Sequence, residues 1–144
     1  MNAEQMWKMY SDQEHITASF DTWAFGVDAD ELADLVLKGV KTATASAFPL
    51  YELDAEVLPQ AGQYSVIVNS RKEAVCVIRT ERVFSVPFDK VDERQAWMEG
   101  EGDRSLAYWR SVHEAVFRKW MEEEGLVFTE KMDVVCEEFV CVFP

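Results

Sequence analysis

Two apolar, β-branched segments follow each other in this chain with only a short polar connection between them. Tyr64–Val68 is typical of a buried strand, and Ala74–Thr80 predicts a second one, with Asn69–Lys72 as the loop of a hairpin. We expect Arg82–Val86 to continue the pairing until Pro87 ends it. Strands that follow each other without a helix between them pair antiparallel. This feature therefore argues against an alternating β-α-β fold and favours an α+β fold.

Helical spacing of apolar residues predicts the elements around these strands. Ala29–Leu37 carries one apolar stripe and predicts a helix capped by Asp28 or Asp30. A long helix is expected over 104–124, with Gly125 as its stop. The other expected elements are a short helix over 3–11, a strand or buried loop over 19–26, a short helix over 91–98, and last strands over 127–128 and 132–143.

These elements predict five or six mainly antiparallel strands, in a sheet that could close into a barrel, with three helices set around it. No internal repeat, low-complexity tract or linker divides the sequence. We therefore expect one domain over 1–144, with a short N-terminal helical extension over about 1–18. Hydrophobic residues make up 49% and charged residues 28%, which are the proportions of a globular protein.

The formal net charge of −13 restricts the partners that this chain can have. A protein binds a nucleic acid duplex by replacing counterions with Lys and Arg, so we expect neither a DNA duplex partner nor broad non-specific binding. A nucleoside carries no phosphate, and an RNA can still bind in a local basic cleft. The charge therefore leaves small-ligand chemistry open.

Other features of the sequence favour a cytoplasmic protein without a membrane partner or a dedicated zinc site. No apolar run approaches the roughly 20 residues that cross a bilayer, and Met1–Gln5 lacks a basic and then apolar pattern. The three cysteines have no C-x-x-C spacing and are expected as reduced, buried thiols. His15 and His113 are far apart in sequence. His113 is expected on the face of the long helix that packs into the protein core.

A Lys and three hydroxyl residues follow the predicted helix stop. Gly39 ends the helix because only Gly takes a positive φ without strain, and Lys41, Thr42, Thr44 and Ser46 come directly after it. In an extended segment the three hydroxyl side chains share one face and Lys41 points to the other, whereas a turn could bring all four together. The alternative to a functional site is a solvated turn.

This segment offers two kinds of chemistry. With a pKa lowered by burial, the Lys41 amine could take the hydroxyl proton and make Thr44 a nucleophile. As a charged ammonium, Lys41 could instead bind phosphate or polarise a carbonyl group. Thr44 lies three positions after Lys41, a separation that a single bend of the chain brings within hydrogen-bond reach.

An acidic loop is the second candidate. Its carboxylates, Glu99, Glu101 and Asp103, alternate with glycines and could supply a general acid or base. We expect Asp103 to cap the long helix, which leaves Glu101 as the better catalytic candidate. The residues that could contact an anion are Arg79, Arg82 and Arg104.

The segments around these candidates resemble the ASCH domain family, which is related to PUA-like RNA-binding barrels. The signature G-x-K-x-x-T of the family matches Gly39, Lys41 and Thr44. The longer pattern is similar to that of small bacterial stand-alone ASCH proteins and spans nearly the whole chain. Its matching segments are 23–26, 35–46, 87–91 and 99–110.

The resemblance implies a PUA-like β-barrel of about six strands with flanking helices and a cleft at the Gly39–Ser46 loop. It also implies binding of RNA or a modified nucleoside in that cleft. One branch of the family hydrolyses N4-acetylcytidine with the motif Lys, the motif Thr and a Glu, which would here be Lys41, Thr44 and Glu101. The third residue maps to the acidic loop without a unique position.

Three functions stay open at this point. The first is a nucleoside or RNA protein that hydrolyses an acylated cytidine-type nucleoside without a cofactor. The second is a ribonuclease that uses a divalent metal ion, and the third is a non-catalytic RNA-binding module. The expected oligomeric state is a monomer or a homodimer. The expected ligand-binding residues are Gly39, Thr42, Ser46, Arg79 and Arg104.

Overall fold

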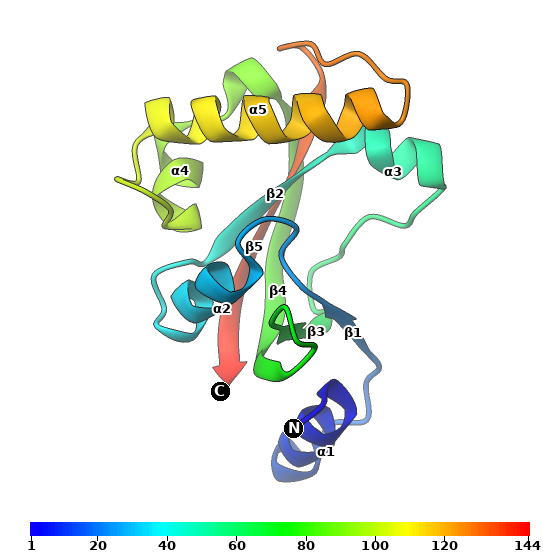
Figure 1. Cartoon of the computed structure of the whole chain (residues 1–144). Helices are drawn as coiled ribbons and strands as arrows, with labels where there is room; N and C mark the ends of the chain where they lie inside the picture. The colour runs from blue at the N-terminus through cyan, green and yellow to red at the C-terminus, as the bar shows by residue number, and fades with distance from the viewer.

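The centre of the protein is a five-stranded sheet. The computed structural model describes residues 1–144, and its strands lie in the order β1-β3-β4-β5-β2 (Figure 1). β1 is parallel to β3, and the other neighbouring pairs are antiparallel. This confirms the α+β class. The strands are β1 Phe20–Trp23, β2 Ala43–Ala47, β3 Tyr64–Val68, β4 Ala74–Pro87 and β5 Asp133–Phe143.

Helices pack around this sheet: the four expected over 3–11, 29–37, 91–98 and 104–124, and one more, over 48–54, that the apolar spacing does not predict. Pro49 stands in the first turn of one of them, where its fixed φ suits a helix start. The α-helices are α1 Ala3–Glu14, α2 Ala29–Leu37, α3 Phe48–Asp54, α4 Glu93–Glu99 and α5 Leu106–Glu123, and Phe88–Lys90 forms a short 3₁₀ helix.

The sheet is not closed into the expected barrel of about six strands. β1 and β2 are its two edges. As predicted, residues 82–86 continue the pairing after 74–80, and both segments belong to one long strand, β4. A register shift between Thr80 and Arg82 accommodates an extra residue without ending the pairing. The strand expected at 127–128 does not form, and these residues lie in the connection from α5 to β5.

The predicted cap of α5 is wrong, and the predicted cap of α2 is correct in position only. Ser105 caps α5, because its hydroxyl accepts a hydrogen bond from the Tyr108 N–H at 3.1 Å. The Asp103 carboxylate accepts from the Ser105 N–H instead, so it stabilises the turn before the cap. Asp28 stands at the start of α2 without a side-chain cap, and Asp30 accepts hydrogen bonds from Ser70.

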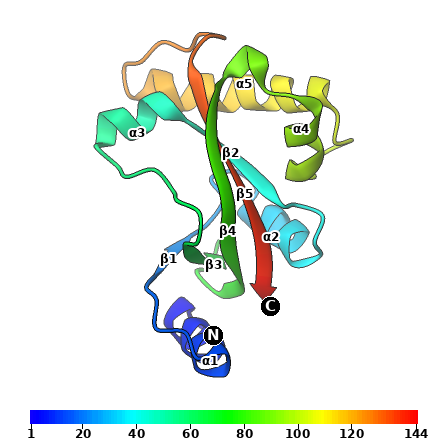
Figure 2. The same cartoon turned by 180° about the vertical axis from the view of Figure 1, so that it is seen from behind.

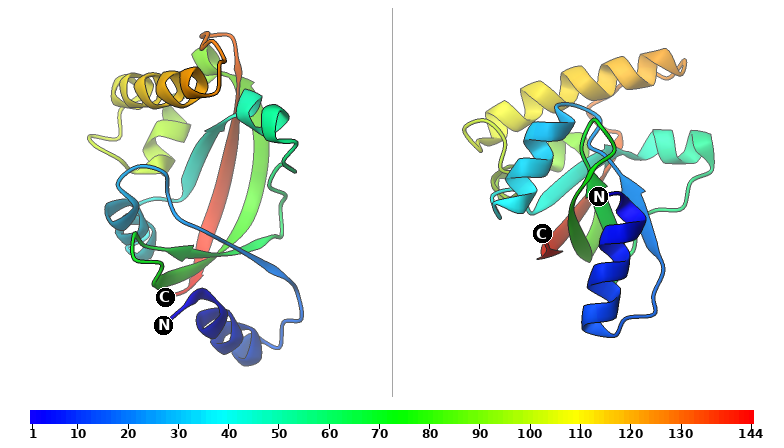
Figure 3. Two further views of the ribbon diagram at one scale, coloured as in Figure 1. Left: turned by 45° about the vertical axis from the view of Figure 1, so that its right-hand side comes forward. Right: turned by 60° about the horizontal axis from the view of Figure 1, so that its bottom comes forward.

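The two ends of the sheet are covered by different helices. α5 lies across one end, and α1 lies at the other end near both chain termini, as the opposite views show (Figures 1 and 2). The long strands β4 and β5 run between these ends (Figure 3). Under α5 the core contains Phe88, Trp109 and Phe117, and under α1 it contains Trp7 and Tyr10. None of the helices has the length and apolar character that a membrane crossing requires.

Two loops meet at the end of the sheet beside α4. Thr42 N–H donates to the Met98 carbonyl at 2.7 Å, and Arg104 donates to the Val40 carbonyl at 3.3 Å. Gly100 has φ +73°, and a Cβ atom there would lie 2.6 Å from the Val40 carbonyl oxygen. Only Gly allows both this backbone conformation and this close approach. The contact places the acidic loop against the segment that follows Gly39.

Candidate ligand site

Lys41 is almost completely buried, with 1% of its surface exposed. Its Nζ lies 2.8 Å from Glu101 Oε2 and 3.5 Å from Glu99 Oε1, and it also donates to the Glu99 carbonyl at 3.4 Å. Both carboxylates come from the end of α4 and the loop after it, while Lys41 comes from the loop before β2. Lys41 thus lies between two carboxylates in a buried ion-pair network.

Glu99 is the best-held carboxylate of the network. Its Oε2 accepts from Trp109 Nε1 at 2.5 Å and from Gln95 Nε2 at 3.0 Å, and its Oε1 lies 3.3 Å from His113 Nε2. Burial by itself raises the pKa of Glu99. The charges of Lys41 and His113, with the hydrogen bonds of His113 and Trp109, outweigh burial and lower this pKa to about 2. Glu99 is therefore ionised near neutral pH.

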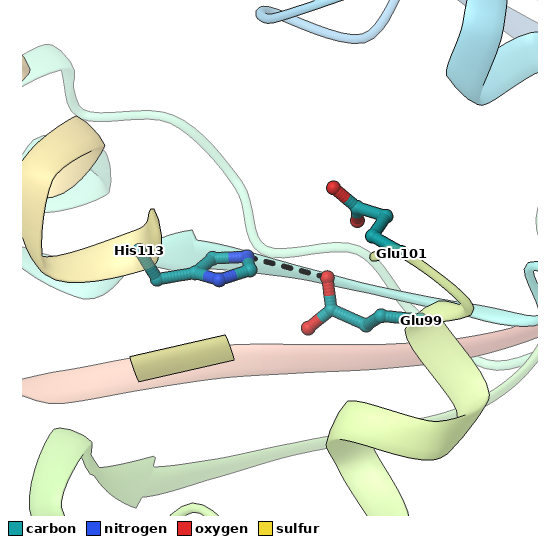
Figure 4. A group of neighbouring side chains, drawn as sticks. All are labelled: Glu99, Glu101 and His113. Carbon is teal, nitrogen blue, oxygen red and sulfur yellow. Dashed lines mark ion pairs between the residues drawn. The ribbon is translucent and has the colours of Figure 1, made fainter. Parts of the chain in front are cut away.

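His113 completes the network from α5. Figure 4 shows its ring pointing at the Glu99 carboxylate, with Glu101 nearby on the loop after α4. Its Nδ1 lies 2.8 Å from the Trp109 carbonyl, which only accepts hydrogen bonds, so Nδ1 carries a proton. Burial lowers the pKa of His113, but the Glu99 carboxylate raises it above the ordinary value of 6.5. Protonation of His113 and ionisation of Glu99 therefore favour each other.

The ligand atoms of Glu99, Glu101 and His113 lie within 4.8 Å of one another, which is close enough to hold a metal ion. However, Lys41 Nζ already pairs with both carboxylates. With His113 protonated, two positive charges balance two negative ones. A divalent ion would have to displace Lys41 and remove the proton from His113. The donor set therefore does not fit a resident divalent cation.

A cavity of about 750 Å³ opens next to this network. Phe25 connects the cavity to the ion-pair network, because it lines the cavity and its ring centroid lies 5.2 Å from Lys41 Nζ. The volume is within the range of pockets that hold small organic ligands. Aromatic side chains from β1, the β1–α2 loop, α3 and α5 line its walls; they are Trp23, Phe25, Tyr51 and Trp120.

The polar lining of the cavity is acidic. Hydroxyl groups contribute hydrogen-bonding capacity from β2 and β3, and three carboxylic acids line the walls, but no Lys or Arg does. The cavity therefore attracts hydrogen-bond donors and positive charge and repels phosphate. The hydroxyl residues on these two strands are Thr44, Ser46 and Ser65, joined by Thr22 on β1 and Tyr51 on α3, and the acids are Asp21, Glu56 and Glu137.

The structure brings some of the predicted site residues together and separates others. Lys41 and Glu101 are in contact, whereas Thr44 lies on the cavity wall and its hydroxyl makes no hydrogen bond with Lys41. Ser46 lines the same wall. Thr42 donates its hydroxyl to the Met98 carbonyl at 3.4 Å, and Gly39, at φ +77°, follows the end of α2.

The two arginines predicted to bind the ligand do not line the cavity. Arg79 lies on β4 and pairs with Glu81 at 2.7 Å. Arg104 follows the acidic loop, donates to the Trp97 carbonyl at 2.9 Å and stacks on the Trp97 ring at 3.8 Å. Its contacts join loops of the protein to each other. Arg82, the third possible anion contact, pairs with Glu138.

Two residues that matter for the site were not predicted. Gln95 donates to Glu99 and to the Thr44 carbonyl at 3.3 Å, and so connects the ion-pair network to the cavity wall. Glu137 lies opposite Thr44 in the β2–β5 pairing and also lines the cavity. Two adjacent carboxylates, Glu137 and Glu138, inside the otherwise apolar run of 134–143 are a signal in the sequence that could have drawn attention to this pair.

Comparisons with known proteins agree with the fold. A family model described as the ASCH domain matches residues 21–143. The ASCH domain from Lactobacillus crispatus JV V101 has 33% identity and a TM-score of 0.92, over 98% of this chain and 94% of that chain. A protein from Enterococcus faecalis V583 has 33% identity and a TM-score of 0.91, over 99% and 88%. A hypothetical protein with 16% identity and a TM-score of 0.53, over 85% and 98%, shares the fold alone. No curated protein matches the chain.

Proposed function

Because the chain belongs to the ASCH domain family, a PUA-like family of RNA-binding folds, we propose that its cavity binds a nucleoside through the base. The observation that carries this proposal is the lining of the cavity, which has four aromatic side chains and three acids but no Lys or Arg. Aromatic rings stack on any base, and carboxylates accept hydrogen bonds from its amino groups. A phosphate would meet only like charge there.

The same cavity could receive one unpaired base of an RNA. In that case the phosphates would have to remain outside, because the walls supply no cation. The net charge of −13 weakens the attraction of a long RNA still further. A free nucleoside therefore suits the charges of this protein better than a polynucleotide does.

A second function, hydrolysis of an acylated cytidine-type nucleoside, is favoured by the position of Thr44 on the cavity wall close to the Lys41 network. Thr44 Oγ1 would attack the acyl carbon, and the bond from that carbon to nitrogen would break. The nitrogen leaves as an amine with the proton that Thr44 gives up. Water then cleaves the acyl-threonine ester, releases the carboxylic acid and restores the hydroxyl.

The proton needs an acceptor near Thr44. Lys41 can accept it only after passing one of its own protons to Glu101, whose Oε2 is 2.8 Å away. Glu101 is suited to this exchange because 18% of its side chain is exposed, whereas Glu99 is buried and fully hydrogen-bonded. The hydrolytic version therefore assigns the nucleophile to Thr44, the base to Lys41 and the proton shuttle to Glu101.

Calorimetric titration with cytidine and cytidine 5′-monophosphate tests the binding proposal. We expect the nucleoside to bind and its monophosphate to bind less tightly. Tyr51→Ala should weaken nucleoside binding by about 5- to 160-fold, since stacking on one base contributes roughly 1–3 kcal/mol. Trp97→Ala is the matched control, because Trp97 is 60% exposed and lies outside the cavity. Tighter binding of the monophosphate, or equal effects of both variants, would refute the proposal.

Incubation with N4-acetylcytidine tests the hydrolytic version. Release of cytidine and acetate should be abolished by Thr44→Ala, while Thr42→Ala, which removes a hydroxyl outside the cavity, should retain it. Absence of turnover by the unaltered protein would leave the binding proposal standing and remove the enzymatic one. Full turnover by Thr44→Ala would remove Thr44 as the nucleophile.

A further inference from the structure

Glu137 is a buried carboxylate with an unused oxygen. The residue is 9% exposed and lies in the middle of β5, on the wall of the cavity. Its Oε2 accepts a hydrogen bond from Thr80 Oγ1 at 2.6 Å, whereas its Oε1 has no partner in the protein. The side-chain oxygens that are buried without a partner are Asp89 Oδ1 and Gln95 Oε1, so Glu137 Oε1 stays accessible on the cavity wall. A ligand in the cavity can therefore donate a hydrogen bond to it.

The surroundings of Glu137 hold no positive charge to pair with it. The titratable groups that face it are Asp21 on β1 and Tyr51 on α3. Burial raises the pKa of Glu137, the Thr80 hydrogen bond partly offsets this, and the charge of Asp21 raises it further. A hydrogen-bond donor on a ligand would relieve this unfavourable environment, while an acceptor would add to it.

The adjacent residue of the strand shows the contrast. Glu138 is 7% exposed, and its side chain points to the other face of the sheet. There it accepts hydrogen bonds from Arg94 at 2.5 and 3.2 Å and from Arg82 at 3.3 Å. The protein therefore supplies arginines to one of two neighbouring buried carboxylates and leaves the other to face the cavity.

We propose that Glu137 determines which bases the cavity accepts, by receiving a hydrogen bond at Oε1 from the exocyclic amino group of the base. The inference rests on the proposed nucleoside-binding function and adds to it a class of ligand. Bases with an amino group at that edge, of the cytosine or adenine type, satisfy the carboxylate. Bases with a carbonyl oxygen there, of the uracil or hypoxanthine type, place two acceptors against each other.

The test uses two matched pairs of nucleosides that differ in this group, cytidine with uridine and adenosine with inosine. In titrations of the full chain at pH 8, the amino member of a pair should bind about tenfold more tightly or better, as is typical of a hydrogen bond to a charged acceptor. In Glu137→Gln the amide can present either its oxygen or its NH₂ group, so the difference should fall to about twofold. Glu138→Gln is the control and should keep the difference.

Each outcome of these titrations either supports or overturns the role of Glu137 in selecting the base. Equal binding of cytidine and uridine by the unaltered protein would overturn the role of Glu137 and leave nucleoside binding intact. The same holds if Glu137→Gln keeps the full preference, or if Glu138→Gln loses it as well. If none of the four nucleosides binds, both proposals fail together. The comparison of the four nucleosides needs no variant, so it decides the inference even if Glu137→Gln does not fold.

Discussion

Replacing Glu99 by Gln should remove a large part of the acid sensitivity of this protein. Glu99 is ionised in the folded state, with a pKa of about 2 against an ordinary value of 4.5. A carboxylate whose pKa is lower in the folded state stabilises the fold above its unfolded pKa, and this contribution is lost as the pH falls through the folded value. The relevant window is therefore about pH 4.5 to 2.

The size of the effect follows from the pKa. At about 1.4 kcal/mol for each tenfold change in proton affinity, the fall from 4.5 to about 2 corresponds to about 3 kcal/mol of folding free energy. Glu99→Gln keeps the shape of the side chain but removes this dependence. The variant should also be less stable at neutral pH by about 3–5 kcal/mol, since it leaves Lys41 and His113 with fewer negative partners.

Urea unfolding at a series of pH values from 7 to 2 measures the effect. The free energy of unfolding of the unaltered protein should fall by about 3 kcal/mol more than that of Glu99→Gln over the acid window. Glu114→Gln is the control, because Glu114 is on the same helix as His113 but is half exposed and pairs only with Arg118 at 3.8 Å. Identical pH profiles of unfolding free energy for Glu99→Gln and the unaltered protein would refute the conclusion that Glu99 is buried and ionised in the folded state.

Three further predictions concern the same region. His113→Asn should lose stability below about pH 6.5 but little above the folded pKa of His113, because a raised pKa stabilises the fold at low pH. Unfolding measured at pH 5.5 and at pH 9 would show this difference, and equal losses of stability at both pH values would contradict it. Gly100→Ala should be more destabilising than Gly62→Ala in thermal unfolding, because both have positive φ but only Gly100 meets a carbonyl oxygen; equal losses would mean that strain alone acts. Millimolar Mg²⁺ or Mn²⁺ should not raise the melting temperature, because Lys41 already pairs with the carboxylates that would bind the ion. A rise in melting temperature that Glu99→Gln abolishes would contradict this prediction.

Much of the fold follows from local signals in the sequence. Gly39 does follow the end of α2 in a left-handed conformation, and the hairpin of β3 and β4 forms where the β-branched runs predict it. The ASCH resemblance is confirmed by the family match over 21–143. The expected barrel does not close, because β1 and β2 do not pair with each other at the two edges of the sheet and the strand expected at 127–128 does not form.

The geometry of the site could be predicted less well, because burial and direction depend on packing between distant segments. The sequence places Glu99 in a flexible acidic loop, but it is the last residue of α4, and the helix turns its side chain toward Trp109. The motif pairs Lys41 with Thr44, yet Lys41 points to the acidic residues instead. Glu137 and Glu138 stand out in an apolar run, but only the folded sheet shows that Glu137 faces a cavity while Glu138 pairs with arginines.

An NMR titration of ¹⁵N-labelled protein with cytidine would locate the ligand. The amide signals that shift should belong to the walls of the cavity, which are 21–26 with Phe25, 44–46 with Thr44, and Tyr51 on α3. Cytidine 5′-monophosphate should shift the same signals only at higher concentration, because the walls carry acids and no Lys or Arg. Shifts confined to Trp97 and the neighbouring arginines, or tighter binding of the monophosphate, would contradict a nucleoside site in this cavity.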